Sequence, residues 1–532
     1  MNKFLRIGAI VLGCLLLLFL IAEVGLSWYA TNKLRTEIDR TETDLEFENL
    51  RISLFKRSGT IRQVEGRYGV GQADTLSGSV SSLYLGGIRW ASLIRAGQLH
   101  ANTLRIEDAD VTYWKTPKSM RSRSSDTTST KTQGEKDTFR LRLNKFQLLN
   151  ARLTGLSRAD SSLLYAVDTI DITGEDMVVA TRDTFSWSQL QTTATGIHIP
   201  EKRRLHDIRI EELRADWSDS TLQATHFSMI PRYSKDDFHK QLTQKTGRND
   251  LTISEIACQG FAFDQLFRDS LQIRRMDIPG FEFDLYIDKR VPHNFNEYKK
   301  LPQEMLAEAG YYIDVDSILI RDGYIKYEHL PAGETNSGWV DFRRLHATIL
   351  NIRSATIPDA PPTTVDVQAS LYGQGPVTVH WSFPNYSAPY SYSFHGSLGQ
   401  FDMDYANNIV VPCSRMEIQS GQIHELNFQA TANNTIATGD MQFFFENADV
   451  VVAPQKDGFF NKLFTDIVEG IAIPEENLAH EKHRLGRMYA ERETSKSIFN
   501  HFWETLVTGM KSTIMPNLIL PDELDHEKDK GN

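Results

Sequence analysis

Residues Tyr312 to His329 read YIDVDSILIRDGYIKYEH, and this stretch decides the class of fold. Apolar and polar side chains alternate on both sides of Asp322-Gly323, which is the pattern of strands with one apolar face. Asp-Gly favours the positive φ angles of a two-residue hairpin turn, so the stretch predicts two antiparallel strands. The predicted cross-strand pairs, all on one face, are Ile320 with Ile325 and Ile318 with Tyr327.

The same pattern occurs earlier in the chain, at 106–113 (IEDADVTY) and at 148–155 (LLNARLTG). Looser versions surround Gly260, Gly280 and Gly421. Because the spacing is irregular, it favours a long meander of hairpins over a solenoid of strict period. The residues expected to line one apolar face, with Ile106 opposite Val111 and Leu104 opposite Tyr113, are Leu104, Ile106, Val111, Tyr113, Leu148, Leu153, Ile318, Ile320, Ile325 and Tyr327.

Short alternating runs continue through most of the chain and predict a mainly β body. A polar, low-complexity loop at 119–137 and a short helix at about 296–309 should interrupt the strands. After residue 452 the apolar spacing becomes helical, at 459–473 and again at 495–514. The second of these helices should be amphipathic, and it would either dock on a membrane or partner surface or close one end of the sheet. Its expected apolar face consists of Ile498, Phe499, Phe502, Trp503, Leu506 and Met510.

The N-terminal residues 1–30 predict a transmembrane anchor, because the segment from Phe4 to Tyr29 is long and apolar enough to cross a bilayer. Lys3 and Arg6 precede it, so the positive-inside rule places the N-terminus in the cytoplasm. Trp28 and Tyr29 are expected to be anchors at the membrane interface. A cleaved signal peptide and a lipoprotein site ending at Cys14 are the alternatives to an uncleaved anchor.

The composition and the motifs argue against several functional classes. A formal net charge of -11 is unlike that of a nucleic-acid-binding protein. The sequence contains no G-x-x-x-x-G-K-[ST] phosphate loop, no C-x-x-C and no H-E-x-x-H, so we expect no catalytic residues, no metal site and no cofactor. Carboxylates could still meet in the fold, which keeps an envelope hydrolase as a weak alternative. Cys258 and Cys413 are either a disulfide or two free buried thiols.

An N-terminal anchor followed by repeated apolar-x-Asp/Asn-small-x-apolar units resembles the AsmA-like superfamily of bacterial envelope proteins, which includes TamB and the YhdP group. Two further segments resemble members from Bacteroidetes. The resemblance implies an elongated, curled, groove-like β-sheet whose concave apolar face lets phospholipid acyl chains pass between membranes. The segments that carry it are Leu45–Ile52, Leu76–Tyr113, Ile318–Tyr327, Ile418–Phe443, Tyr286–Pro292 and Lys496–Trp503.

The sequence thus predicts a non-catalytic, single-pass inner-membrane protein with a periplasmic β body that binds membrane phospholipid and serves outer-membrane lipid homeostasis. The alternative is an anchored scaffold with a packed core that binds an envelope protein through an exposed strand edge. The expected parts are an anchor at 1–30, an N-terminal β region at 31–118, a loop at 119–137, a β-groove body at 138–452, a helical region at 453–520 and a charged tail at 521–532.

Overall fold

The computed structural model describes residues 23–33, 35–36, 44–70, 74–90, 92, 98–117, 140–180, 184–354, 360–384, 390–414, 416–452, 474–479 and 483–514. The predicted loop at 119–137, the predicted helix at 459–473, the charged tail and the first 22 residues of the predicted anchor lie outside these ranges. Within them, no helix has both the length and the hydropathy needed to cross a membrane.

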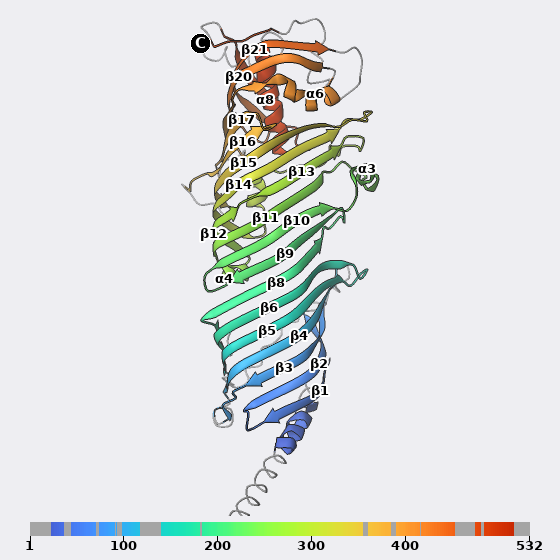
Figure 1. The fold of residues 1–532 in the computed structure, drawn as a ribbon, viewed down its shortest axis with the longest axis vertical. Coiled ribbons are helices and arrows are strands. Elements are labelled where there is room, and N and C mark those ends of the chain that lie inside the picture. The colour runs from blue at the N-terminus through green and yellow to red at the C-terminus, as the bar shows by residue number, and fades with distance from the viewer. Residues whose placement is uncertain are drawn as a thin grey trace, which may run out of the picture. The chain divides into compact units, whose positions relative to one another are not determined.

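The described chain is mainly β, and its strands form one mixed, mostly antiparallel meander sheet (Figure 1). Two compact units are present: residues 1–200 with 208–224, and residues 201–207 with 225–532. The strands of the first unit are β1 (Asp44–Ser53), β2 (Ser58–Val70), β3 (Asp74–Gly86), β4 (Leu99–Lys115), β5 (Arg140–Ser157), β6 (Leu163–Ala180), β7 (Thr184–Ser186) and β8 (Gln189–Pro200). Strands β9 (His206–Asp216) and β10 (Thr221–Pro231) have residues in both units.

The second unit continues the meander and adds short helices. Its strands are β11 (Arg248–Phe261), β12 (Ser270–Ile278), β13 (Phe281–Asp288), β14 (Tyr312–Leu330), β15 (Gly338–Arg353), β16 (Thr363–Leu371), β17 (Gly375–Phe383), β18 (Tyr392–Leu398), β19 (Phe401–Asp402), β20 (Met416–Ala432), β21 (Ile436–Val452) and β22 (Leu485–Glu491). Its helices are α3 (Lys235–Phe238), η2 (His239–Gln241), α4 (Phe263–Leu266), α5 (Pro302–Ala307), η3 (Met403–Ala406), α6 (Asn407–Cys413) and α8 (Ile498–Ile514). Helix α5 lies inside the segment predicted to be helical at about 296–309.

The hairpin predicted at Asp322-Gly323 is wrong, because β14 runs without a turn from Tyr312 to Leu330. Asp322 does have the predicted positive φ, at 51°, but within a β-bulge. Two strands pair in parallel with the two parts of β14: β12 before the bulge and β13 after it. The residues expected to face each other across the turn therefore lie along one strand.

The bulge keeps the apolar residues of β14 on one face. Ile320 pairs with Ala347 and Gly323 pairs with Leu345, so β14 advances by three residues where β15 advances by two. Residues two apart on a strand share a face, as Ala347 and Leu345 do, so Ile320 and Gly323 share a face as well. One Asp at positive φ thus shifts the alternation by one position, and the apolar pattern continues on the same side.

The two earlier copies of the pattern lie in neighbouring parallel strands, β4 and β5, and the copy at Asn150 is a bulge of the same kind against β6. Asp108 has a φ of 53° and Asn150 a φ of 55°, and Asn150 Nδ2 donates a hydrogen bond of 2.6 Å to Asp108 Oδ1. Ile106 pairs with Leu148 in β5 rather than with Val111. The predicted pairs within the first copy are therefore wrong, although the face they assigned is the same.

Replacing Asn150 by valine should destabilise the first unit by about 2 kcal/mol, because a β-branched residue resists positive φ and the hydrogen bond to Asp108 is lost. Asn150→Gly loses the same hydrogen bond but accepts the backbone conformation, so it should cost less than about 1 kcal/mol. Urea unfolding followed by circular dichroism measures both. Equal destabilisation by the two substitutions would contradict a strained bulge.

Parallel pairing explains the long connection between β4 and β5. Parallel neighbours need a crossover of a dozen or more residues, whereas antiparallel ones can be joined by a tight turn. Residues 116–139, which include the polar segment predicted as a loop, form this connection. The low-complexity segment thus stands where the topology requires a long link.

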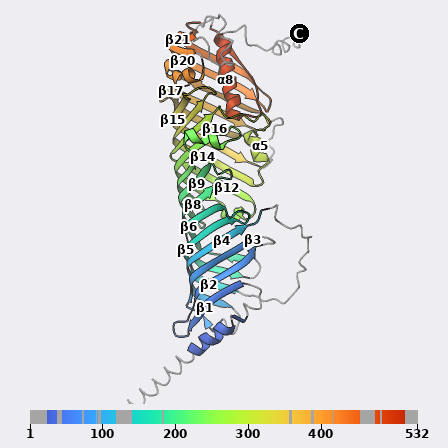
Figure 2. The same cartoon turned by 90° about the vertical axis from the view of Figure 1, so that its right-hand side faces the viewer.

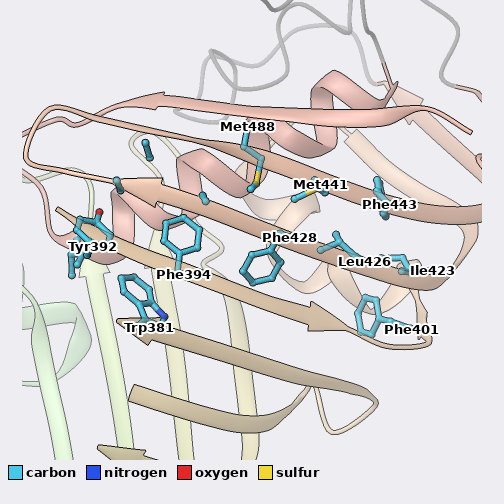
Figure 3. Packing of buried hydrophobic residues seen from close by; sticks show 14 of the residues in the cluster. Trp381, Tyr392, Phe394, Phe401, Ile423, Leu426, Phe428, Met441, Phe443 and Met488 are labelled. Carbon is cyan, nitrogen blue, oxygen red and sulfur yellow. The ribbon is translucent and has the colours of Figure 1, made fainter. Parts of the chain in front are cut away.

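The principal core of the second unit lies between α8 and the strands from β17 to β22 (Figures 2 and 3). Aromatic rings dominate it: Phe502 of α8 lies 4.9 Å from Trp381, 5.0 Å from Phe394 and 5.9 Å from Phe428, centroid to centroid. Met441 and Met488 complete the contact below the helix. This end of the sheet therefore has a conventional protein core.

Helices provide hydrogen-bond partners for backbone groups on the outer edges of β1 and β22. Ser27, in the helix at 23–33, accepts a 2.9 Å hydrogen bond from the Ile52 amide of β1, and Thr31 donates to the Leu50 carbonyl at 3.3 Å. In α8, Ser512 and Thr508 accept hydrogen bonds of 2.9 and 3.0 Å from the Arg487 and Tyr489 amides of β22. Exposed strand edges invite pairing with other chains, and these helices occupy the two edges.

Candidate functional site

The apolar face of the first unit is the main candidate site. Residues that pair across strands share a face, so each ladder can be followed from strand to strand. One ladder joins Leu83, Ile106, Leu148 and Ile172 from β3 to β6. A second joins Val111, Leu153 and Val167, and a third joins Leu76, Tyr113, Gly155 and Tyr165. The sequence pattern therefore produces a continuous apolar surface.

This face is only partly buried in the described residues. Strands β2 to β6 and β8 make their main contacts within the unit with neighbouring strands of the same sheet, and β1 also contacts the helix at 23–33. The cluster of Ala101, Leu143 and Met177 is buried, but the large side chains along the ladders are half-buried, and Leu76 is 37% exposed. A surface of this kind is unfavourable in water, because each exposed CH₂ group loses about 0.8 kcal/mol that burial would supply.

The opposite face of the same strands is polar. Arg105 lies 3.7 Å from Glu107 on β4, and Arg152 of β5 lies 3.5 Å from Asp110. These pairs are exposed and contribute little stability. Their position shows that the sheet separates an apolar side from a solvated one.

The structure places the predicted lining residues of the second unit in the same kind of ladder. Ile325 pairs with Phe283 and Phe342, and Tyr327 pairs with Leu285 and Val340. Burial raises the pKa of the Tyr327 hydroxyl well above its usual value. All ten predicted lining residues are half-buried, and in both units they share a face with other apolar residues or glycine.

Helix α8 divides the apolar residues that the sequence grouped on one side. Ile498, Phe502, Leu506 and Met510 pack against the core. Phe499 and Trp503 are 71% and 43% exposed, respectively. The predicted interface anchors Trp28 and Tyr29 are also exposed, at 68% and 58%.

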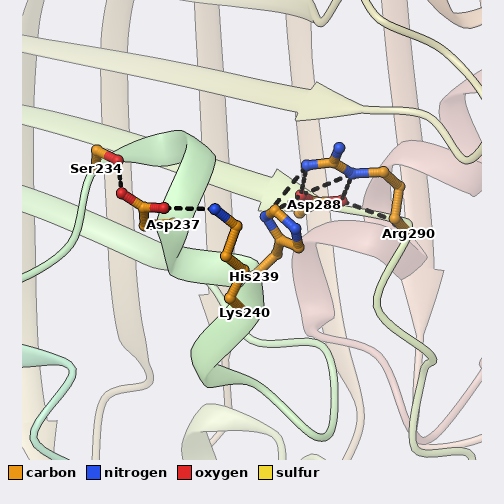
Figure 4. A network of polar contacts seen from close by, with 6 residues as sticks. All are labelled: Ser234, Asp237, His239, Lys240, Asp288 and Arg290. Carbon is orange, nitrogen blue, oxygen red and sulfur yellow. Dashed lines mark hydrogen bonds and ion pairs between the residues drawn. The ribbon is translucent and has the colours of Figure 1, made fainter.

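Charged groups of the second unit form paired networks. Asp288 accepts a 2.6 Å hydrogen bond from Arg290 Nη2 and lies 3.6 Å from His239 Nδ1 (Figure 4). Burial would raise the pKa of Glu328, but hydrogen bonds from Lys235, Ser337 and Lys326 outweigh it and hold that pKa at about 2. Both carboxylates are ionised and accept hydrogen bonds from neighbouring side chains.

No group of His, Cys, Asp and Glu side chains suited to a metal ion exists among the described residues. A hollow of about 420 Å³ has three histidines and Asp366 in its lining, together with apolar residues such as Ile320 and Val379. Asp366 Oδ1 lies 2.6 Å from His380 Nδ1. Cys258 and Cys413 are free and buried, and burial raises the pKa of each thiol to about 11. The thiols are therefore protonated and poor nucleophiles at neutral pH.

Sequence reasoning did not find the helix-covered edges, because Ser27 and Ser512 carry no local signal of their partners in distant strands. No protein-family model matches the chain, and no curated protein matches it in sequence. The candidate site therefore depends on its own chemistry.

Proposed function

We propose that the apolar sheet face binds the acyl chains of membrane phospholipid, and that the protein is an anchored envelope component of AsmA-like type in lipid handling. The observation that carries the proposal is the half-buried apolar ladder of the first unit, whose described strands make their main contacts with neighbouring strands of the sheet. Acyl chains bury such a surface without requiring hydrogen-bond partners.

The character of the face favours lipid over a protein partner. Aliphatic side chains such as Ile106, Leu148 and Leu153 form two of the three ladders, and none of the three contains an arginine, a residue enriched at the energetic centres of protein interfaces. Each buried CH₂ contributes about 0.8 kcal/mol, so a chain of a dozen methylenes binds with useful affinity even after ordering costs. In this proposal the sheet is curled around the lipid, and residues 1–30 are the inner-membrane anchor that places the body in the periplasm.

The scaffold alternative receives less support. It needs an exposed strand edge, but β1 and β22 have helices hydrogen-bonded along their outer sides. A scaffold would also need a packed core throughout. The described core with a covering helix belongs to the strands from β17 to β22.

The test is the lipid content of the full chain purified in mild detergent. Native mass spectrometry should find bound phospholipid in the wild type. Val111→Glu places a charge on the apolar face and should reduce bound lipid at least about tenfold, because an ionised group is costly to bury against acyl chains. Thr112→Glu, one residue along β4 and on the polar face, should leave it unchanged.

A photoreactive benzoylphenylalanine at position 111 provides a second measurement that does not depend on the glutamate variant folding. It should cross-link to lipid, whereas the same group at position 112 should not. A wild-type protein without lipid, or equal cross-linking at the two positions, would overturn the proposal.

A further inference from the structure

Lys289 stands at the margin of the apolar face in the second unit. Ile287 of β13 pairs with His329 of β14, and the Lys289 amide donates a 3.0 Å hydrogen bond to Leu330. Strand alternation places Lys289 on the side of Ile287, with the apolar Leu285 and Phe283 farther in. Lysine at this position ends an apolar row.

The chain before β11 brings Lys245 to the same margin. The Lys245 amide donates a 2.9 Å hydrogen bond to the Pro292 carbonyl, three residues beyond Lys289. Two residues after Lys245, a β-carbon on Gly247 would contact the side chains of Leu285 and Ile287. This segment therefore lies against the apolar side of β13.

The third lysine, Lys496, belongs to a distant part of the sequence. Ser495 is fully buried, and its hydroxyl lies 2.8 Å from His293 Nε2. The Thr494 carbonyl accepts a 2.8 Å hydrogen bond from the Lys299 amide. These contacts bring Lys496 to the segment that follows Lys289.

The three lysines act on one another electrostatically. Burial, moderated by Cys413 and Glu504 and reinforced by Lys245 and Lys496, lowers the pKa of Lys289 to about 8. Burial and Lys496 lower the pKa of Lys245. Burial, Lys245 and Lys496 also lower the pKa of His293, against smaller opposing effects of Glu493 and Glu297. The three lysines are therefore close enough to act on one another and on His293.

The polar side of the same chain segment is arranged differently. Asp288 and Arg290, the neighbours of Lys289 in sequence, form a close ion pair with each other (Figure 4). Because alternate residues point to opposite sides, this pair balances charge on the polar side while Lys289 stands on the apolar side. Lys289 and this ion pair therefore stand on opposite sides of the segment.

We propose that Lys245, Lys289 and Lys496 bind the phosphate of a phospholipid headgroup whose acyl chains lie on the adjoining apolar row. The inference rests on the proposed function, and adds to it the position and the chemical class of the headgroup. Lysine ammonium groups are good phosphate ligands, and an amphiphile requires a cationic margin beside an apolar surface. Partly buried like charges also repel one another, so a bound anion stabilises the cluster.

The experiment compares two ligands with one acyl chain: oleoyl lysophosphatidylglycerol and monooleoylglycerol, which lacks the phosphate. Binding to the full chain in a non-ionic detergent is measured by native mass spectrometry titration. The wild type should bind the phosphate-bearing lipid at least about tenfold more tightly, a difference of about 1.4 kcal/mol. The triple variant K245Q/K289Q/K496Q should lose this preference and keep its affinity for monooleoylglycerol.

The matched control is K202Q/K240Q/K300Q, which removes three exposed lysines of the same unit. It should retain the full preference, and near-ultraviolet circular dichroism checks that both triple variants are folded. Equal affinity of the wild type for the two lipids overturns the headgroup site and leaves the proposed function intact.

Failure of both lipids to bind overturns the proposed function. A titration with inorganic phosphate tests whether the lysines bind a free anion instead of a lipid headgroup. Phosphate binding that requires the three lysines, with no lipid bound, overturns the headgroup assignment in favour of a free anion. Competition of phosphate with the lysophospholipid, but not with monooleoylglycerol, supports it.

Discussion

The Gly486→Val variant should lose the docking of α8 on β22 and be destabilised by about 3–5 kcal/mol, because a side chain there overpacks the contact and breaks hydrogen bonds. A β-carbon at Gly486 would overlap the Gly509 carbonyl oxygen and the Thr513 hydroxyl. Valine would separate the helix from the strand and remove the bonds that Ser512 and Thr508 accept from β22.

Hydrogen exchange of the α8 and β22 amides is the measurement, because it separates loss of the helix from global unfolding. Gly59→Val is the control: Gly59 is also a strand glycine, in β2, and no atom lies within 4 Å of the place where its β-carbon would stand. Gly59→Val should change amide hydrogen exchange in the first unit only slightly. Unchanged protection of α8 in Gly486→Val would show that the helix does not depend on this close approach.

The sequence was sufficient to predict which residues share the apolar face, because the alternation of apolar and polar residues along a strand does not depend on which strand pairs with it. Ile106, Leu148 and Ile320 share a face with other apolar residues. The turn was predicted wrongly at Asp322 because a hairpin and a bulge both require a residue at positive φ. Only the register of the neighbouring strand, Ala347 to Leu345, distinguishes the two.

Features that depend on distant pairing had no local signal. The parallel alignment of Asp108 with Asn150 is decided by the connection between two strands and not by either strand alone. Helical spacing placed Phe499 and Trp503 with Phe502, but the helix meets the sheet along a narrower stripe and leaves the first two exposed. The gathering of Lys245 with Lys496 likewise depends on segments far apart in sequence.

Truncation of one leucine in each unit should distinguish a filled core from an open face. Leu426 in β20 is 6% exposed and belongs to the core under α8, with Leu398 and Phe443 as its strand neighbours. Leu426→Ala should destabilise the second unit by about 3 kcal/mol, because the lost contacts leave a cavity. Leu153 in β5 is half-buried, so Leu153→Ala should cost only about 1 kcal/mol in lipid-free protein.

Urea unfolding monitored by hydrogen exchange in each unit gives both values, and it should be repeated after incubation with phospholipid. Bound acyl chains would contact the Leu153 side chain, so its truncation should then cost more, while the cost at Leu426 stays unchanged. A cost of about 3 kcal/mol at Leu153 without lipid would mean that protein side chains already cover the apolar face, because truncation costs that much only where it leaves a cavity in a packed interior. The apolar ladder would then be an ordinary core, and the lipid proposal would lose its main support.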